Sequence, residues 1–207
     1  MPRIYYCTAE EIEPIYDAAA ELVTAKRRKK AERLLKKEDR LLSVGASLML
    51  RSVLKINSDE EMLYNEHGKP YLEHGPCFSI SHSGNTAVLV VSENEIGADI
   101  EKLRTPDIRI AKRSFSEEEA ELAMLSPENF TRLWTRKEAV LKLLGAGFSV
   151  SPKNIDLGLE KKKYELFGIK FGFFETEIEQ MPFSAAFCGE DSEFMVEQLS
   201  KEELLKI

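Results

Sequence analysis

The sequence predicts an α+β fold made of two similar halves, each with helices packed on an antiparallel sheet. Two observations predict it: a helical apolar stripe is followed by short apolar runs with turns between them, and the same order returns later in the chain. The dipeptides Phe78-Ser79 and Phe183-Ser184 occupy comparable places in the two parts. We therefore expect an internal duplication, with residues 1–102 as the N-terminal half and residues 103–207 as the C-terminal half.

In the N-terminal half, residues 1–7 predict an opening strand and the apolar positions of residues 34–53 predict a helix. Gly68-Lys69-Pro70 interrupts the chain. Three apolar runs then predict the strands of one antiparallel sheet: Cys77–Ile80, Thr86–Val91 and Ile96–Glu101.

In the C-terminal half, Ser116 followed by Glu119 is a capping-box signal for a helix. Pro127 separates it from a second helix, which is expected to end at Gly145. Strand-like runs follow, with a hairpin turn at residues 189–192 between the last two of them: Tyr164–Phe174, Phe183–Cys188 and Glu193–Gln198.

Composition is that of a soluble globular protein. The chain has 207 residues, 43% hydrophobic and 31% charged, which suits a buried core and argues against disorder. No apolar run reaches the roughly 18 residues of a membrane span, and the N-terminus lacks the apolar core of a secretory signal. Cys7, Cys77 and Cys188 form no pair spaced like metal ligands, so we expect a cytoplasmic protein with free thiols.

Charge is distributed unevenly along the chain. The net charge is −7, yet residues 26–40 contain nine basic and three acidic side chains, a net charge of +6 that leaves −13 for the remainder. The overall charge disfavours general nucleic-acid binding. The basic segment indicates one localised anionic ligand or partner, and a solvated helix face is the competing explanation.

Two carboxylates share one face of the predicted strand Ile96–Glu101. Because side chains alternate along a strand, Asp99 and Glu101 point the same way. Such charges repel unless a cation lies between them or water screens both, and Mg²⁺ takes hard oxygen ligands together with a substrate phosphate. A half-exposed antiparallel strand with a polar outer face explains the same pattern.

A helical triad follows in the C-terminal half. Trp134, Glu138 and Lys142 are spaced by four residues and therefore share one side of the predicted helix. Glu138 is expected at the border of the buried stripe, as a third oxygen ligand or a general base, and Lys142 can meet a phosphate. A simple helix ion pair, worth only a few tenths of a kcal/mol, is the alternative, and the spacing does not choose between them.

Two turns carry weaker signals. The stretch from Ser81 to Gly84 is a polar turn around His82 that can hydrogen-bond an anion, although a lone histidine is more often structural. Lys69 can contact a phosphate from the rigid turn in which it lies. A zinc site made of the scattered histidines is not expected. The sequence also contains neither a Rossmann glycine motif nor a phosphate-binding loop.

These residues resemble a known family. The blocks 97–101 (Gly-Ala-Asp-Ile-Glu) and 134–142 (Trp-Thr-Arg-Lys-Glu-Ala-Val-Leu-Lys) are similar to the two signature blocks of the 4′-phosphopantetheinyl transferases of the surfactin-synthetase-activating (Sfp) type. The second block matches at every position, and the first departs only at Ala98, where the family usually has Ile or Val. Gly68-Lys69-Pro70 and the stretch 80–84 are also similar in order and spacing. The resemblance covers nearly the whole chain and weakens after residue 152.

The resemblance implies a pseudo-twofold fold with coenzyme A bound between the halves. It implies transfer of the 4′-phosphopantetheine arm of coenzyme A to a serine of an apo acyl or peptidyl carrier protein, with release of adenosine 3′,5′-bisphosphate. The expected cofactor is Mg²⁺, and the expected enzyme is a monomer with no nucleic-acid or membrane partner. Carriers of fatty-acid, polyketide and nonribosomal-peptide synthesis are all compatible with it.

Carried over residue by residue, the resemblance assigns Asp99, Glu101 and Glu138 to Mg²⁺ and makes Glu138 the base for the incoming serine. Lys142 and His82 complete the predicted catalytic set and contact the phosphates. The other predicted coenzyme A contacts are Arg27, Lys30, Ser43, Lys69, Pro70 and Ser81.

Two alternatives from other classes remain. A metal-dependent nuclease is suggested by Asp-x-Glu-Lys at residues 99–102, but the net charge of −7 argues against it. A non-catalytic coenzyme A or carrier-protein binding module has the same pocket, and the intact acidic residues and Lys142 argue against that.

Overall fold

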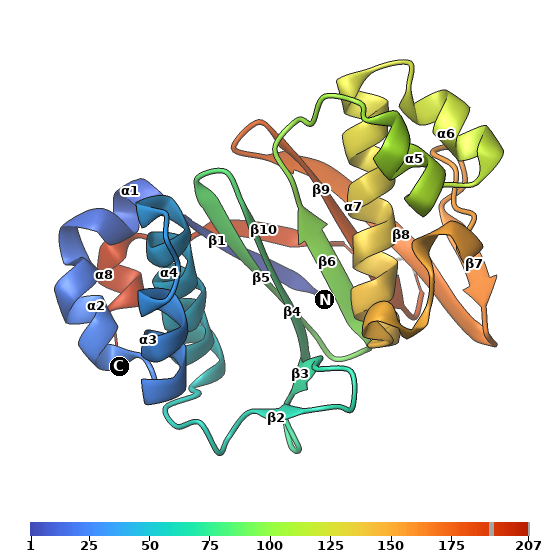
Figure 1. Cartoon of the computed structure of the whole chain (residues 1–207). Helices are drawn as coiled ribbons and strands as arrows, with labels where there is room; N and C mark the ends of the chain where they lie inside the picture. Colours follow the sequence, from blue (N-terminus) through green and yellow to red (C-terminus); the bar gives the residue numbers. More distant parts are fainter. Residues whose placement is uncertain (191–192, 207) are drawn as a thin grey trace.

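The computed structural model describes residues 1–190 and 193–206, and in them the chain forms two four-stranded sheets with helices on each (Figure 1). In the first sheet the strand order is β10 (Met195–Gln198), β1 (Arg3–Thr8), β5 (Thr86–Ser92) and β4 (Cys77–Ser83). In the second it is β6 (Ile96–Ile100), β9 (Met181–Cys188), β8 (Ile169–Ile178) and β7 (Lys163–Leu166). A small pair, β2 (Leu63–Tyr64) and β3 (Pro70–Tyr71), lies between the two groups in the view. The predicted α+β class is confirmed.

Helices divide between the two sheets, as Figure 1 shows. The N-terminal group packs beside the first sheet: α1 (Ala9–Ile12), α2 (Tyr16–Leu22), α3 (Ala25–Glu32) and α4 (Lys37–Leu54), joined by α8 (Lys201–Leu204). The other group packs beside the second sheet: α5 (Ile108–Ser114), α6 (Glu117–Ala123) and α7 (Pro127–Leu144). Short 3₁₀ turns lie at Glu13–Ile15, Gly147–Ser149 and Pro152–Asn154. Among the described helices, none combines the length and the apolar character needed to span a bilayer.

Local sequence signals explain the ends of the helices around the second sheet. Ser116 and Glu119 form the predicted capping box of α6, and Ser126 caps α7 with Pro127 in its first turn. Helix α7 ends at Gly145, which has φ +60°, a left-handed conformation that favours glycine at a helix C-terminus. The predicted strands and helices of the first half also form, with α4 burying its apolar face in the core.

Strand β6 corrects one prediction. We expected it in the sheet of β4 and β5, but it pairs with β9 in the second sheet. All five of its residues are buried, so it is not the half-exposed strand that was the alternative. The backbone of β6 forms its ladder with β9, and β4 reaches this segment through serine side chains instead of a backbone ladder: the Ser79 hydroxyl accepts the Ala98 N–H at 2.9 Å and the Ser83 hydroxyl accepts the Lys102 N–H at 3.1 Å.

Two further strand predictions were wrong in detail. The run 164–174 contains a turn at Phe167-Gly168, where both residues have positive φ, so it forms β7 and most of β8 instead of one strand. The final strand β10 pairs in parallel with β1, not as a hairpin with β9. Asp191 and Ser192 of the expected hairpin turn lie outside the described residues.

The two sheets exchange strands across the predicted division between residues 102 and 103. Strand β6 comes from the N-terminal segment and completes the second sheet, whereas β10 comes from the C-terminal segment and joins the first sheet. The division stays a prediction, and the exchange ties the two halves together at the place where β4 and β6 meet.

Candidate active site

Helix α7 lies directly against β6, and Gly97 makes this contact possible. A Cβ atom at Gly97 would lie 2.1 Å from both the Ala139 carbonyl oxygen and the Leu143 backbone nitrogen, so no side chain fits there. The close approach brings the Glu138–Lys142 turn of the helix beside Asp99, two residues further along the strand. The glycine of the first signature block therefore has a packing role.

Asp99 is held by two donors at one oxygen. Lys142 Nζ lies 2.7 Å from Asp99 Oδ1, and the Ser81 hydroxyl donates to the same oxygen at 2.6 Å. Lys142 also donates to the Ala98 carbonyl oxygen at 3.0 Å. The alternative of a simple helix ion pair between Glu138 and Lys142 does not form in the described structure, because the lysine reaches across to the strand.

Glu101 has its own hydrogen-bond donor and its own cation. It accepts a hydrogen bond from the Ser83 hydroxyl and pairs with Arg104, whose guanidinium lies 3.6 Å away. Arg104 in turn lies over the ring of Trp134, 4.7 Å from its centre. The strand carboxylates are thus each held by one serine of β4 and one cation.

Glu138 completes an acidic cluster. Burial raises the pKa of the Glu138 carboxyl, the charge of Asp99 raises it further, and Lys142 opposes both. Glu101 also contributes to this rise, so the three predicted carboxylates share one electrostatic environment. Within residues 1–190 and 193–206, however, no three acidic, histidine or cysteine side chains already stand close enough together to hold a metal ion.

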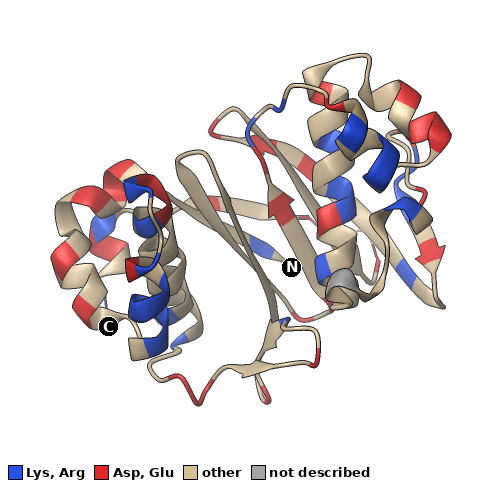
Figure 2. Cartoon of the chain, viewed as in Figure 1, with Lys and Arg blue, Asp and Glu red and all other residues tan. Residues whose placement is uncertain are grey.

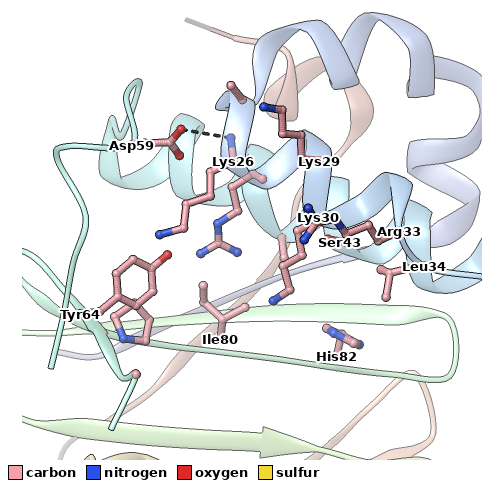
Figure 3. A pocket seen from close by; sticks show the side chains of 15 residues that line it. Lys26, Lys29, Lys30, Arg33, Leu34, Ser43, Asp59, Tyr64, Ile80 and His82 are labelled. Atoms are coloured by element: carbon pink, nitrogen blue, oxygen red, sulfur yellow. Dashed lines mark hydrogen bonds between the residues drawn. The ribbon is translucent and has the colours of Figure 1, made fainter. Parts of the chain in front are cut away.

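A cavity of about 880 Å³ opens between α3, α4 and β4, and we call it the basic cavity (Figure 3). Its lining includes five of the predicted coenzyme A contacts: Arg27, Lys30, Ser43, Pro70 and His82. Lys26, Lys29 and Arg33 add further positive charge. Figure 3 shows Lys26, Lys30 and His82 with their side chains directed into the same space.

A second cavity of about 680 Å³, here the apolar cavity, adjoins the first. The two cavities share Gly68, Pro70 and Ile80 in their walls. The remaining lining combines polar and charged residues, among them Lys69, Glu138 and Lys142, with five apolar side chains: Phe78, Trp134, Leu141, Val150 and Pro152. Glu138 of the acidic cluster therefore lines a cavity that shares walls with the basic cavity.

His82 lies within β4 and not in a turn after it, which corrects the sequence-based placement. Burial lowers the pKa of His82, and the ammonium groups of Lys142 and Lys30 lower it further. The imidazole is therefore neutral near pH 7 and can donate one hydrogen bond without carrying charge.

Lys69 has a different environment from the other predicted phosphate contacts. Its ammonium lies 2.5 Å from Glu95 Oε2 and donates to the Leu143 carbonyl oxygen at 3.0 Å, near the end of α7. Asn65 donates to the Gly145 carbonyl oxygen at 2.8 Å in the same region. These bonds attach the β2–β3 segment to α7, and Lys69 lines the apolar cavity but not the basic one.

Several residues that shape this site were not singled out from the sequence. Ser79, Ser81 and Ser83 are two residues apart along β4. This spacing places their side chains on one face of the strand, and it could have indicated Ser79 and Ser83 from the sequence. Arg104 gave no signal. Lys137 is fully buried, 2.5 Å from Glu119, and donates to the Pro152 and Ile155 carbonyl oxygens at 2.9 and 2.6 Å. It therefore fixes the segment that forms one wall of the apolar cavity.

The fold and the site define a two-halved α+β enzyme with an acidic cluster beside a basic cavity, and comparison with known proteins gives the family. The family model of the 4′-phosphopantetheinyl transferase superfamily matches residues 95–188. A 4′-phosphopantetheinyl transferase from Bacillus subtilis is 30% identical over 201 residues, which cover 88% of this chain and 90% of the relative.

Two further relatives have the same class of name. The transferase gsp of Aneurinibacillus migulanus is 34% identical over 124 residues, 55% of this chain and 52% of its own. The transferase Sfp of Bacillus subtilis strain 168 is 31% identical over 140 residues, 62% of each chain. The chain belongs to the 4′-phosphopantetheinyl transferase superfamily, is of the Sfp type, and is an enzyme of that class.

Proposed function

We propose that the protein transfers the 4′-phosphopantetheine arm of coenzyme A to a serine of an apo acyl or peptidyl carrier protein and releases adenosine 3′,5′-bisphosphate. One observation supports this best: a strongly basic cavity and an apolar cavity share walls, with Glu138 and Lys142 beside the apolar one. Coenzyme A has the same division, with a highly charged nucleotide end and a long neutral arm.

The basic cavity suits the nucleotide end. Burial lowers the pKa of Arg27, and burial together with the charge of Arg27 lowers the pKa of Lys30. Cations that have lost hydration and repel one another gain from an anion placed between them. Lys29 and Arg33 on the same wall add charge for a second phosphate group. Predicted contacts such as Ser43 and Pro70 lie on the adjoining wall.

The apolar cavity suits the pantetheine arm. Its Phe78, Leu141 and Val150 side chains can pack on the arm, and Lys142 lies among the lining residues, available to the phosphate that the arm carries. The basic segment of residues 26–40 thus accounts for the nucleotide end, and the residues around α7 account for the reacting end.

The three carboxylates fit Mg²⁺ in their chemistry. They supply hard oxygen donors, and the pKa of Glu138 is raised by burial and by the charge of Asp99, a cost that a divalent cation relieves. Asp99, Glu101 and Glu138 are the residues that would hold it. When bound, Mg²⁺ supplies charge stabilisation for the leaving bisphosphate.

The residues of the chain account for the rest of the reaction. The serine oxygen of the carrier forms a bond to the phosphorus of the arm, and the bond from that phosphorus to the oxygen of adenosine 3′,5′-bisphosphate breaks. Glu138 accepts the serine proton, the role that the family resemblance assigns to it. Lys142 neutralises phosphate charge, and neutral His82 donates a hydrogen bond. Positioning and charge neutralisation are sufficient for this class of transfer.

Mass spectrometry of an apo carrier protein, incubated with the enzyme, coenzyme A and MgCl₂, tests the proposal. We expect the carrier to gain the mass of one phosphopantetheine arm, and to gain it about 10²–10³-fold more slowly with Glu138→Gln. Binding of coenzyme A without any mass gain on fatty-acid, polyketide or peptide carriers would favour the non-catalytic module, and cleavage of DNA would favour the nuclease. We also propose that the enzyme acts in the cytoplasm and that it is a monomer, and light scattering of the purified enzyme tests its oligomeric state.

A further inference from the structure

Each strand carboxylate of the site is paired with a cation that the chain itself supplies. Lys142 lies 2.7 Å from Asp99, and Arg104 lies 3.6 Å from Glu101. Lys142 was predicted as a phosphate contact, whereas Arg104 had no predicted role. The two ion pairs neutralise the two acids that were assigned to the divalent cation.

The acids and the cations differ in how firmly they are held. Asp99 and Glu101 accept hydrogen bonds from Ser81 and Ser83, which lie on a strand of the other sheet. Their side chains are 9% and 22% exposed, whereas those of Lys142 and Arg104 are 31% and 30% exposed. The longer and more exposed cationic side chains can reach another anion, whereas the more buried carboxylates cannot leave their place. The serines therefore fix the carboxylates, and the cations are the movable partners.

Lys142 competes with a metal ion for the same atom. Its ammonium contacts Asp99 Oδ1, and that oxygen already accepts the Ser81 hydroxyl. A divalent cation that arrives alone must displace the ammonium and then lie close to it, because the Ala98 carbonyl oxygen also holds Lys142 near the strand. A pyrophosphate that arrives with the cation offers Lys142 and Arg104 new anionic partners.

We propose that Lys142 and Arg104 act as resident counter-ions that exclude a bare divalent cation and release the carboxylates only when a pyrophosphate group takes them over. The inference rests on the proposed function. It makes metal binding and coenzyme A binding mutually dependent, and such coupling is reciprocal: each ligand raises the affinity for the other by the same factor. Arg104 is a positioning residue in this scheme.

Trp134 gives a readout that is independent of turnover. It is the only tryptophan in the chain, and the Arg104 guanidinium lies 4.7 Å from its ring centre. Movement of Arg104 from Glu101 to a phosphate changes the environment of this indole. Tryptophan fluorescence, together with calorimetry, therefore follows MgCl₂ binding to the enzyme with and without coenzyme A and with no carrier present.

In the wild-type enzyme we expect Mg²⁺ to bind at least about tenfold more tightly when coenzyme A is bound, within the usual range for coupled sites. In Lys142→Met we expect Mg²⁺ alone to bind about tenfold more tightly than to the wild type, with most of the coupling lost. Arg104→Met should change Mg²⁺ binding in the same direction. Lys170→Met is the matched control, because this lysine side chain is 83% exposed on β8 and should leave both affinities unchanged.

Two outcomes overturn the inference: Mg²⁺ affinity of the wild type that does not depend on coenzyme A, or Lys142→Met binding Mg²⁺ no more tightly than the wild type. Circular dichroism of each variant checks that it is folded. Labelling of a carrier by the wild type is measured separately. If the wild type labels carriers and either outcome is observed, this inference alone is contradicted. If the wild type labels no carrier, the proposed function is contradicted.

Discussion

Helix α7 carries two lysines that each pair with a carboxylate at nearly the same distance, but one pair is buried and the other is partly exposed. Lys137 lies 2.5 Å from Glu119 with both side chains 2% exposed, and Lys142 lies 2.7 Å from Asp99 with side chains 31% and 9% exposed. The first pair is sealed inside the second half and bonded to backbone carbonyls as well. The second borders a cavity. The comparison teaches that burial, not residue type or distance, separates an ion pair that holds the fold from one that is available to a ligand.

The sharpest test of this contrast is Lys137→Met. The change leaves Glu119 buried with its cation removed, and we expect a loss of about 3–5 kcal/mol in the free energy of unfolding. Urea denaturation measures it. The double variant Lys137→Met with Glu119→Gln should recover part of the loss, because no unpaired charge then remains and the amide oxygen can still accept the Leu157 N–H. A single variant as stable as the wild type would show that the pair does not hold the fold.

Glu138 follows Lys137 in the sequence, and Glu138→Gln removes the proposed base while the Lys137–Glu119 ion pair stays in place. We expect transfer to the carrier to slow by about 10²–10³-fold with the denaturation midpoint nearly unchanged. Single-turnover mass spectrometry measures the rate. Normal turnover by this variant means that Glu138 is not the base.

Lys142→Met breaks the partly exposed pair between Lys142 and Asp99. We expect a smaller loss in the free energy of unfolding than in Lys137→Met, about 1 kcal/mol, because Lys142 is partly exposed and Asp99 keeps its hydrogen bond from Ser81. Transfer should nevertheless fall by roughly tenfold to a hundredfold through lost phosphate binding. A stability loss as large as that of Lys137→Met would remove the distinction between the two pairs.

Lys30→Ala tests the basic cavity away from α7. Its KM for coenzyme A should rise about tenfold, equivalent to about 1.4 kcal/mol of binding. The KM for the carrier protein should stay constant. Equal effects on both substrates would place Lys30 outside the nucleotide site.

The smallest effect is expected at an exposed pair. Hydrogen bonds from Arg109 lower the pKa of Asp107 to about 2, from an ordinary value of 3.8. Because the folded pKa is the lower one, the stabilisation is complete above pH 3.8 and is lost as the pH falls through about 2. Carboxyl NMR titration measures this value, and Arg109→Ala should return it toward 3.8.

Local sequence patterns predicted several features of this molecule correctly. The capping box at Ser116, the Gly145 end of α7 and the strand alternation that sets Asp99 and Glu101 on one side depend only on near neighbours in the chain. The sheet to which β6 belongs could not be predicted in this way, because its partner β9 is about 85 residues away and nothing local encodes the pairing. The exchange of β10 was missed for the same reason.

Figure 2 shows basic and acidic residues spread over both halves. The spacing along α7 indicated Lys142 as a phosphate contact but indicated no role for Lys137. The sequence by itself determined the α+β class, the family blocks and the charged segment of residues 26–40, because these are carried by local patterns. Only the tertiary structure decided that Lys137 is sealed, that Lys142 crosses to Asp99, and that Arg104 covers Glu101. Those outcomes depend on which distant backbone lies against each side chain, and close packing of α7 on Gly97 sets that arrangement.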